Sequence, residues 1–248
     1  MTLLLLPFSV YQRGDEVAAK LSRQLPRMLG AGLEPVLAPH EVTVRYLSSR
    51  GTGADGRPGL VATSEMPSLD DLETTARMYG ANFVLYGKFG LTEKEILLES
   101  RLFDMKRGID TYAKAFQTYP TYYFDAVEEL KMRVIQTMGI APGDYERAAL
   151  FTRPTDSWQA YLFYLLAEDD RYAATLGILP QDPEGTIRLY REALDIDVDF
   201  TAAKEGLQHF LVITIEHRLV SDEYLQRIIR ELTSVLDQEF VAAINDVL

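Results

Sequence analysis

Residues 82–119, NFVLYGKFGLTEKEILLESRLFDMKRGIDTYAKAFQTY, carry the clearest secondary-structure pattern of the chain. The apolar residues of this stretch recur with a period of two, which is the period of a β-strand. In EILLESRLF, Ile96, Leu98 and Leu102 share one face, while Glu99 and Arg101 lie on the other. Polar turns at residues 92–94 and 104–108 separate three such segments. The pattern predicts an antiparallel meander of three strands.

The segment before the meander contains helical spacing. An apolar stripe from Val17 to Met28 recurs at three and four residues, as on one face of a helix. Pro26 predicts a kink or an early end, and Gly30 with Gly32 predict the stop. The apolar run Leu33–Ala38 then predicts a strand.

Two further helices frame the meander. Ser68 and Asp71 have capping-box spacing, and Gly80 is placed to end that helix in the left-handed conformation. A third apolar stripe covers residues 124–138. The order β-α-β-α-β-β-β-α predicts an α/β domain with a mixed sheet over residues 1–140.

The opening MTLLLLPFSV is apolar, and we interpret Leu3–Phe8 as a buried first strand. The alternative is a targeting segment, but no basic n-region and no small-residue cleavage site accompany the run. No run approaches the roughly 18 apolar residues of a membrane span. We therefore expect no membrane span and a cytoplasmic location, with the periplasm left open. The absence of cysteine fits either compartment.

Residues 141–248 lose the strand pattern and are expected to form an all-α domain of helical hairpins. One repeated sequence motif supports the stacking of similar helical hairpins. DVDFTAA at 197–203 and DQEFVAA at 237–243 share the form D-x-[DE]-F-x-A-A at a spacing of 40 residues. Small residues at matching positions let helices pack closely, as in repeat proteins.

Charge is distributed unevenly between the halves. Residues 1–140 hold 16 Lys+Arg and 17 Asp+Glu, and residues 141–248 hold 9 and 20, which together give the net charge of −12. The acidic half is unsuited to nucleic acid, whose recognition needs clustered Lys and Arg. The charge serves solubility or, alternatively, a basic or mostly apolar protein partner.

The first half resembles the TolB amino-terminal-like α/β domain, and the second is similar to tetratricopeptide repeats. The resemblance covers roughly residues 3–8 and 68–207. It rests on Ala76, Gly80, Val84-Leu85-Tyr86-Gly87, Leu102-Phe103-Asp104 with Gly108, and the segments TDSWQAYLFYLL and YREALDIDVDFTAA. The spacing of 40 exceeds the usual 34 of that repeat, which leaves the number of repeats open. The resemblance implies a binding or assembly role of the kind found in bacterial regulatory proteins, and it brings no catalytic residues.

The motifs that would indicate chemistry are incomplete. Gly51–Gly56 spells G-x-G-x-x-G, but Arg57-Pro58-Gly59 follows where a dinucleotide site needs a helix. Asp195, Asp197 and Asp199 have calcium-loop spacing without the glycine and glutamate that an EF-hand requires, so we expect helix capping instead. The three histidines are too far apart to chelate one metal, and no G-x-S-x-G is present. We expect no catalytic residues, no cofactor and no metal.

Aromatic residues are the candidates for partner contact. In TYPTYYF, residues 118–124, the spacing does not allow Tyr119, Tyr122 and Tyr123 all to point inward, and tyrosine is enriched at interfaces. Packing in the core or at its edge is the competing interpretation. Trp158 and Tyr161 open the helical half, where we expect Trp158 to pack the first helix against the α/β domain.

The sequence therefore favours a non-enzymatic protein. We expect it to bind a protein or peptide through its helical repeats and to be capable of self-association, because the final FVAAINDVL lacks a hairpin partner. The alternative is a small-molecule or nucleotide sensor with a pocket beside Gly51–Gly59. A purely structural subunit is the third possibility.

Overall fold

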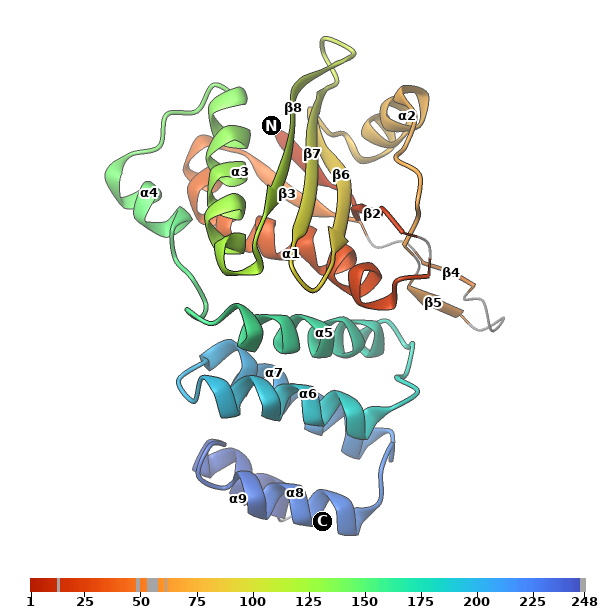
Figure 1. Ribbon diagram of the computed structural model, residues 1–248, viewed down its shortest axis with the longest axis vertical. Coiled ribbons are helices and arrows are strands. Elements are labelled where there is room, and N and C mark those ends of the chain that lie inside the picture. Colours follow the sequence, from red (N-terminus) through yellow and green to blue (C-terminus); the bar gives the residue numbers. More distant parts are fainter. Residues whose placement is uncertain (13, 48–49, 53–57, 61, 246–248) are drawn as a thin grey trace. The chain divides into compact units, whose positions relative to one another are not determined.

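The computed structural model describes residues 1–12, 14–47, 50–52, 58–60 and 62–245, and it divides into two compact units, Met1–Arg153 and Pro154–Leu248. Figure 1 shows a mixed sheet with helices in the first unit and helices alone in the second. The strands are β1 (Thr2–Leu5), β2 (Ser9–Val10), β3 (Thr43–Tyr46), β4 (Arg50–Thr52), β5 (Pro58–Leu60), β6 (Phe83–Leu91), β7 (Ile96–Asp104) and β8 (Ile109–Thr118). The helices of the first unit are α1 (Glu16–Leu37), α2 (Leu69–Tyr79), α3 (Tyr123–Thr137) and α4 (Asp144–Leu150), with short 3-10 turns at Ala38–His40 and Pro120–Tyr122.

The sheet has the order β3-β1-β6-β7-β8, with β2 also pairing with β6. β1 runs parallel to β3 and β6, whereas β6, β7 and β8 form the antiparallel meander that the sequence predicts. The mixed α/β architecture is thus confirmed. β8 is an edge strand, and its pairing with β7 shifts register between Leu102 and Phe103, near the start of β8.

Alternate residues of the meander face different helices. α2 covers the face that carries Val84, Tyr86 and Phe103, where it contributes Leu72 and Ala76. α3 lies against β7 and β8 on the opposite face, and α1 contacts β6, β3 and β2. β6 is therefore buried on both sides, as its apolar sequence indicates.

The prediction of a strand at Leu33–Ala38 is wrong. α1 continues through Pro26 and past Gly30 and Gly32 to Leu37, and the next strand is β3 at Thr43–Tyr46. The buried residues of α1 keep their helical spacing to its end. Gly30 is packed rather than terminal, because a Cβ there would lie 2.1 Å from Cε1 of Tyr46.

The ends of α2 confirm the prediction. Ser68 Oγ accepts a hydrogen bond from Asp71 N (3.2 Å), and Asp71 Oδ2 accepts from Ser68 N (3.2 Å), which completes the capping box. Gly80 ends the helix with φ of +61°. This left-handed conformation strains a residue with a side chain, so glycine suits the position.

The division between the units falls after Arg153, later than the boundary at residue 140 drawn from the sequence. α4 contacts α1 and α3, so it belongs to the first unit. Arg153 Nη2 lies 2.6 Å from Asp125 Oδ1, and its Nε lies 2.8 Å from Glu128 Oε1, both on α3. These ion pairs join Arg153, the last residue of the first unit, to α3.

The second unit consists of helices, as the sequence predicts. They are α5 (Trp158–Thr175), α6 (Pro183–Ile196), α7 (Thr201–Glu216), α8 (Asp222–Leu232) and α9 (Gln238–Asn245). α5, α6 and α7 pack on one another, and a file of aromatic rings joins them. The Tyr164 ring lies 6.4 Å from the Tyr190 ring, which lies 6.4 Å from the Phe210 ring.

The two copies of the D-x-[DE]-F-x-A-A motif pack differently. Phe200 and Ala203, which open α7, are fully buried. Phe240 is only partly buried at the start of α9, and Ala242 and Ala243 are exposed. α7 is covered by α5 and α6, whereas the last helix has this alanine face open.

Candidate functional site

The tyrosines at the start of α3 divide into two groups. Tyr119 and Tyr122 are 63% and 56% exposed. Tyr123 is only 2% exposed, and its hydroxyl donates to the sulfur of Met28 at 3.2 Å. Tyr123 therefore belongs to the core between α1 and α3. Phe124, beside it, is also buried.

The aromatic candidates of α5 are mostly internal. Tyr161 is 3% exposed, and its ring lies 5.9 Å from the Tyr164 ring and 6.3 Å from the Phe200 ring. Trp158, the first residue of α5, is partly buried. Tyr161 thus packs the interior of the helical unit. Three of the five candidates lie in the first unit, and Trp158 and Tyr161 lie in the second.

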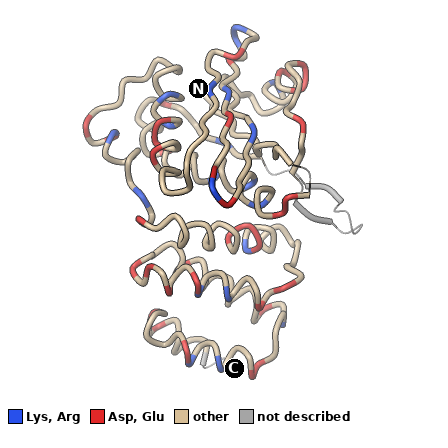
Figure 2. The backbone as a smooth tube through the Cα atoms, in the orientation of Figure 1, with Lys and Arg blue, Asp and Glu red and all other residues tan. Residues whose placement is uncertain are grey.

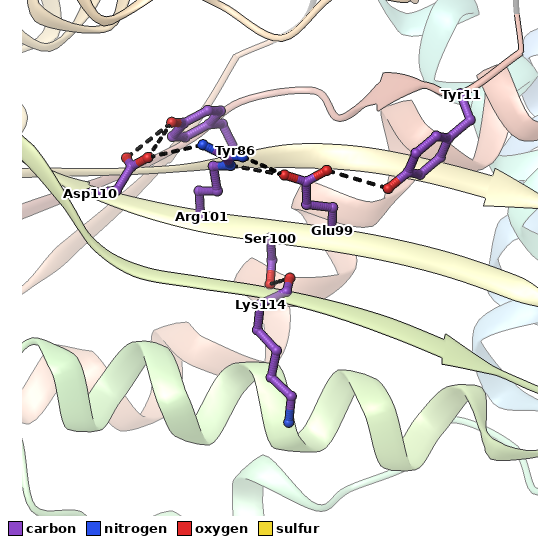
Figure 3. Close-up of polar contacts among 7 residues, drawn as sticks. All are labelled: Tyr11, Tyr86, Glu99, Ser100, Arg101, Asp110 and Lys114. Atoms are coloured by element: carbon purple, nitrogen blue, oxygen red, sulfur yellow. Dashed lines mark hydrogen bonds and ion pairs between the residues drawn. The ribbon is translucent and has the colours of Figure 1, made fainter.

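A polar network lies on the face of the meander opposite α3 (Figure 3). Arg101 Nη2 lies 2.7 Å from Glu99 Oε1, and its Nη1 lies 3.5 Å from Asp110 Oδ2. Tyr86 donates to Asp110 Oδ2 at 2.9 Å, and Tyr11 donates to Glu99 Oε2 at 3.3 Å. The network thus joins β6, β7 and β8 to the residue that follows β2.

The electrostatics of this network favour a structural role. Burial and then the hydrogen bond to Asp110 raise the pKa of Tyr86 above its ordinary value. Tyr86 is therefore a protonated hydrogen-bond donor at neutral pH, not a base. The bond to Glu99 raises the pKa of Arg101. Each of these groups already has a partner of opposite charge or polarity.

The other face of the meander holds Ser100 and Lys114, which Figure 3 shows on the side of α3. Lys114 reaches Glu129 of α3 and lies 4.5 Å from the centre of the Phe116 ring. These contacts join the edge strand to the helix that covers it. A lysine on an edge strand also discourages pairing with another chain.

The remaining polar cluster lies in the second unit, between α6 and α8. A pocket of about 300 Å³ opens there. Its lining residues follow helical spacing, at 184, 188 and 191 on one helix and at 224, 227, 228 and 231 on the other, so each helix contributes one face. They are Glu184, Arg188 and Arg191 of α6, and Tyr224, Arg227, Ile228 and Glu231 of α8.

Only part of the charge in this pocket is paired. Arg191 Nη1 lies 2.9 Å from Glu231 Oε2, which is a direct ion pair. Arg188 lies 3.8 Å from an exposed carboxylate, that of Asp182. Arg227 stacks over the Tyr224 ring at 5.0 Å. No carboxylate within the described part of the chain pairs with Arg227.

The charged residues of the pocket affect the pKa of Tyr224. Burial and then the charge of Glu184 raise the pKa of its hydroxyl, and the three arginines oppose this rise. The hydroxyl has no hydrogen-bond partner among the described residues. The pocket therefore presents a phenol and two guanidinium groups with donors to spare, an arrangement that binds negatively charged oxygen atoms.

The pocket between α6 and α8 is not among the sites expected from the sequence. Arg188 and Arg227 are far apart in the sequence, and the acidic composition of the second half was weighed only against nucleic-acid binding. A signal was nevertheless present, because residues 184, 188 and 191 share one helical face and residues 224, 227 and 231 share another. Only the packing of α8 near α6 brings the two faces together.

The other expected motifs have no site in the described residues. Gly51 lies in β4 and pairs with Gly59 of β5 in a two-stranded sheet, and residues 53–57 of the G-x-G-x-x-G match lie outside the described residues. The next described element is thus a strand, not a helix. No group of three metal-binding side chains occurs where the structure describes the chain. No described helix combines the length and apolarity that crossing a bilayer requires.

The aspartates with calcium-loop spacing have a local role that differs from the expected cap. No side chain caps the start of α7. Asp197 instead accepts hydrogen bonds from Thr155 Oγ1 at 2.5 Å and from Asp199 N at 3.1 Å. Asp197 thus links the turn between α6 and α7 to Thr155, near the start of the second unit.

Comparisons with protein-family models and with curated proteins give no match to this chain. Among solved structures it is similar to TolB from Acinetobacter baumannii, with 13% identity and a TM-score of 0.38 over 58% of this chain and 30% of that one. It is also similar to a dodecamer of a PelC variant from Paraburkholderia phytofirmans, with 13% identity and a TM-score of 0.30 over 55% of this chain and 87% of that one. Lipoprotein GNA1162 from Neisseria meningitidis matches with 13% identity and a TM-score of 0.28 over 56% of this chain and 97% of that one. The chain thus spans less than a third of the TolB structure, and at these TM-scores the likenesses carry no argument about function or assembly.

Proposed function

We propose that this chain is a non-enzymatic interaction protein that binds a protein or peptide partner through the helices of residues 154–248. In this proposal the unit is a stack of tetratricopeptide-like hairpins, and residues 1–153 form a TolB-like companion domain. The observation that carries the proposal is the pocket between α6 and α8. Its polar groups point to a ligand because they exceed what the chain's own partners satisfy.

The construction of the helical unit supports this role. Fully buried side chains such as Tyr190, Phe200 and Phe210 hold the stack together. Outward residues remain exposed, among them Val198 and Val212. Stacked helices with a firm interior and an open exterior present a surface of fixed shape, which limits the ordering cost of binding.

Polar contacts attach the last hairpin to the helices before it. Lys204 Nζ of α7 lies 2.5 Å from Asp237 Oδ1, and Gln208 Nε2 donates to Asp237 Oδ2 at 2.9 Å. Together with the pair of Arg191 and Glu231, these contacts hold the hairpin of α8 and α9 beside α6 and α7. The pocket is therefore formed before any partner arrives.

A photo-crosslinking experiment tests the proposal on the full chain. A photoreactive amino acid replaces exposed Glu223 of α8 in one variant and exposed Thr74 of α2 in another. In extract of the source cells, we expect a discrete heterologous adduct from position 223 and none from position 74. An adduct only from position 74, or none from 223, contradicts the proposal. A product of two copies of the chain alone indicates a structural subunit.

The sensor alternative has its own test. A thermal-shift series with nucleotides and small acids measures whether a small ligand stabilises the chain. We expect no nucleotide to raise the melting temperature. A strong rise that disappears in a Gly51→Ala, Gly53→Ala double variant favours a sensor over an interaction protein.

A further inference from the structure

Basic residues gather in one place on an otherwise acidic unit. Residues 154–248 contain 7 Lys+Arg against 18 Asp+Glu, and Figure 2 shows acidic positions along these helices. Three of those seven basic residues line the pocket between α6 and α8. Side chains that served only solubility would be spread along the surface, as most of the acidic residues are.

The charge balance of the pocket leaves cationic groups available. Its lining holds three arginines and two glutamates, so its net charge is positive. The pair of Arg191 and Glu231 is neutral as a unit. Arg188 and Arg227 remain, and they face Glu184 as the other carboxylate of the lining. An incoming anion thus meets two guanidinium groups with uncommitted N–H donors.

The packing holds the donors ready for a ligand. Arg227 is stacked on the Tyr224 ring, which restricts its guanidinium plane and lowers the entropy lost on binding. The Tyr224 hydroxyl lies within the influence of all three arginines. A carboxylate between them accepts two parallel bonds from a guanidinium and one from the phenol.

Size and charge select the ligand. A pocket of about 300 Å³ is at the lower limit for small-molecule sites, so it admits an acidic side chain rather than a nucleotide. Glu184 and Glu231 repel a dianion more strongly than a singly charged group. A carboxylate therefore suits the lining better than a phosphate.

We propose that Arg188, Arg227 and Tyr224 form a recognition site for a side-chain carboxylate of an acidic peptide segment. The inference rests on the proposed interaction function and names the chemistry of its partner. Because the whole chain carries a net charge of −12, an acidic peptide is repelled at long range. Its binding then depends on these side chains, which makes the site sensitive to single substitutions.

Fluorescence anisotropy with the full chain tests the site. The probe is a labelled eight-residue peptide of alternating Glu and Gly, and its control replaces each Glu with Gln. We expect the Glu peptide to bind and the Gln peptide not to bind. Arg227→Met lowers the affinity about tenfold or more, because charge-assisted bonds are lost.

Arg230→Met is the matched control, since Arg230 is exposed on the same helix outside the pocket and donates to Gln226 O at 3.1 Å. We expect it to leave the affinity within about twofold of wild type. Tyr224→Phe removes only the hydroxyl and keeps the ring beneath Arg227. It lowers the affinity about threefold or more without changing the circular dichroism spectrum.

Several results would overturn the inference. The inference is wrong if the Glu peptide does not bind, or if the Gln peptide binds as tightly as the Glu peptide. It is also wrong if Arg227→Met and Arg230→Met lower the affinity for the Glu peptide equally. Inorganic phosphate that displaces the peptide while binding more tightly than acetate overturns the preference for a carboxylate. An adduct from position 223 without peptide binding leaves the interaction function standing and rejects this site alone. Peptide binding without any adduct supports this site and contradicts only the expected capture of a partner from the cell extract.

Discussion

A buried ion pair inside the helical unit gives the sharpest stability prediction. Glu168 of α5 accepts a hydrogen bond from the Tyr190 hydroxyl at 2.6 Å and lies 2.6 Å from Arg171 Nε. Glu168 and Tyr190 are buried, and Arg171 is largely so. α7 approaches this cluster through Gly206, where a Cβ would lie 2.7 Å from Glu168 Oε1. The cluster therefore joins three helices.

The structure sets the sizes of the expected losses. Tyr190→Phe removes one charge-assisted bond and leaves Glu168 paired with Arg171, so it lowers the free energy of unfolding by about 1.5–3 kcal/mol. Glu168→Ala strands the Arg171 guanidinium and the Tyr190 hydroxyl together, and it costs about 3–5 kcal/mol. In the double variant the ring at position 190 carries no hydroxyl to be stranded. The loss in the double variant is therefore smaller than the sum by about 1–3 kcal/mol.

Urea unfolding followed by tryptophan fluorescence measures these losses. Trp158 is the only tryptophan and opens α5, so its signal reports on the helical unit. Far-UV circular dichroism follows the whole chain and shows whether the two units unfold separately. A change below about 0.5 kcal/mol for Tyr190→Phe, or additive losses in the double variant, would mean that Glu168, Tyr190 and Arg171 are not coupled in the folded chain.

Three further predictions concern the α/β unit. Burial lowers the pKa of Lys131 below 10.5, so the folded chain binds fewer protons than the unfolded chain between the two pKa values. Stability from Lys131 therefore rises with pH across that window, and urea titrations should find the rise missing in Lys131→Met. Gly80→Ala places a Cβ in open space at φ +61°, so it isolates backbone strain and costs about 1–2 kcal/mol in thermal unfolding. Gly87→Ala puts a Cβ 1.9 Å from the carbonyl oxygen of Glu99, and we expect a loss above about 3 kcal/mol or an insoluble chain. Soluble expression of Gly87→Ala with an unchanged melting temperature contradicts that packing.

Local signals explain why much of the fold was predictable. The meander has alternating residues and polar turns, and α2 has a capping box and a terminal glycine, so each signal lies within the element it defines. α1 shows where such signals fail. The glycines of α1 have the composition of a helix stop, and Leu33–Ala38 has that of a strand. The helix nevertheless continues, because Gly30 leaves room for the Tyr46 ring that packs against it. Only the tertiary contact distinguishes a packed glycine from a terminal one.

The candidate site was less predictable because it depends on contacts between elements. The spacing in residues 118–124 correctly implied that its tyrosines point in different directions, but it did not show that Tyr123 is the buried one. Tyr161 has the residue type of an interface and lies in the interior of the helical unit. The pocket of Arg188 and Arg227 arises only when two separate helices pack together.

Hydrogen–deuterium exchange on the full chain, with and without the captured partner, tests the claim that the helical unit is the binding surface. Exchange reports local opening and burial along the whole backbone. We expect slower exchange in residues 183–196 and 222–232 when the partner is present, with α2 and β8 unchanged. Slower exchange confined to residues 1–153 contradicts it.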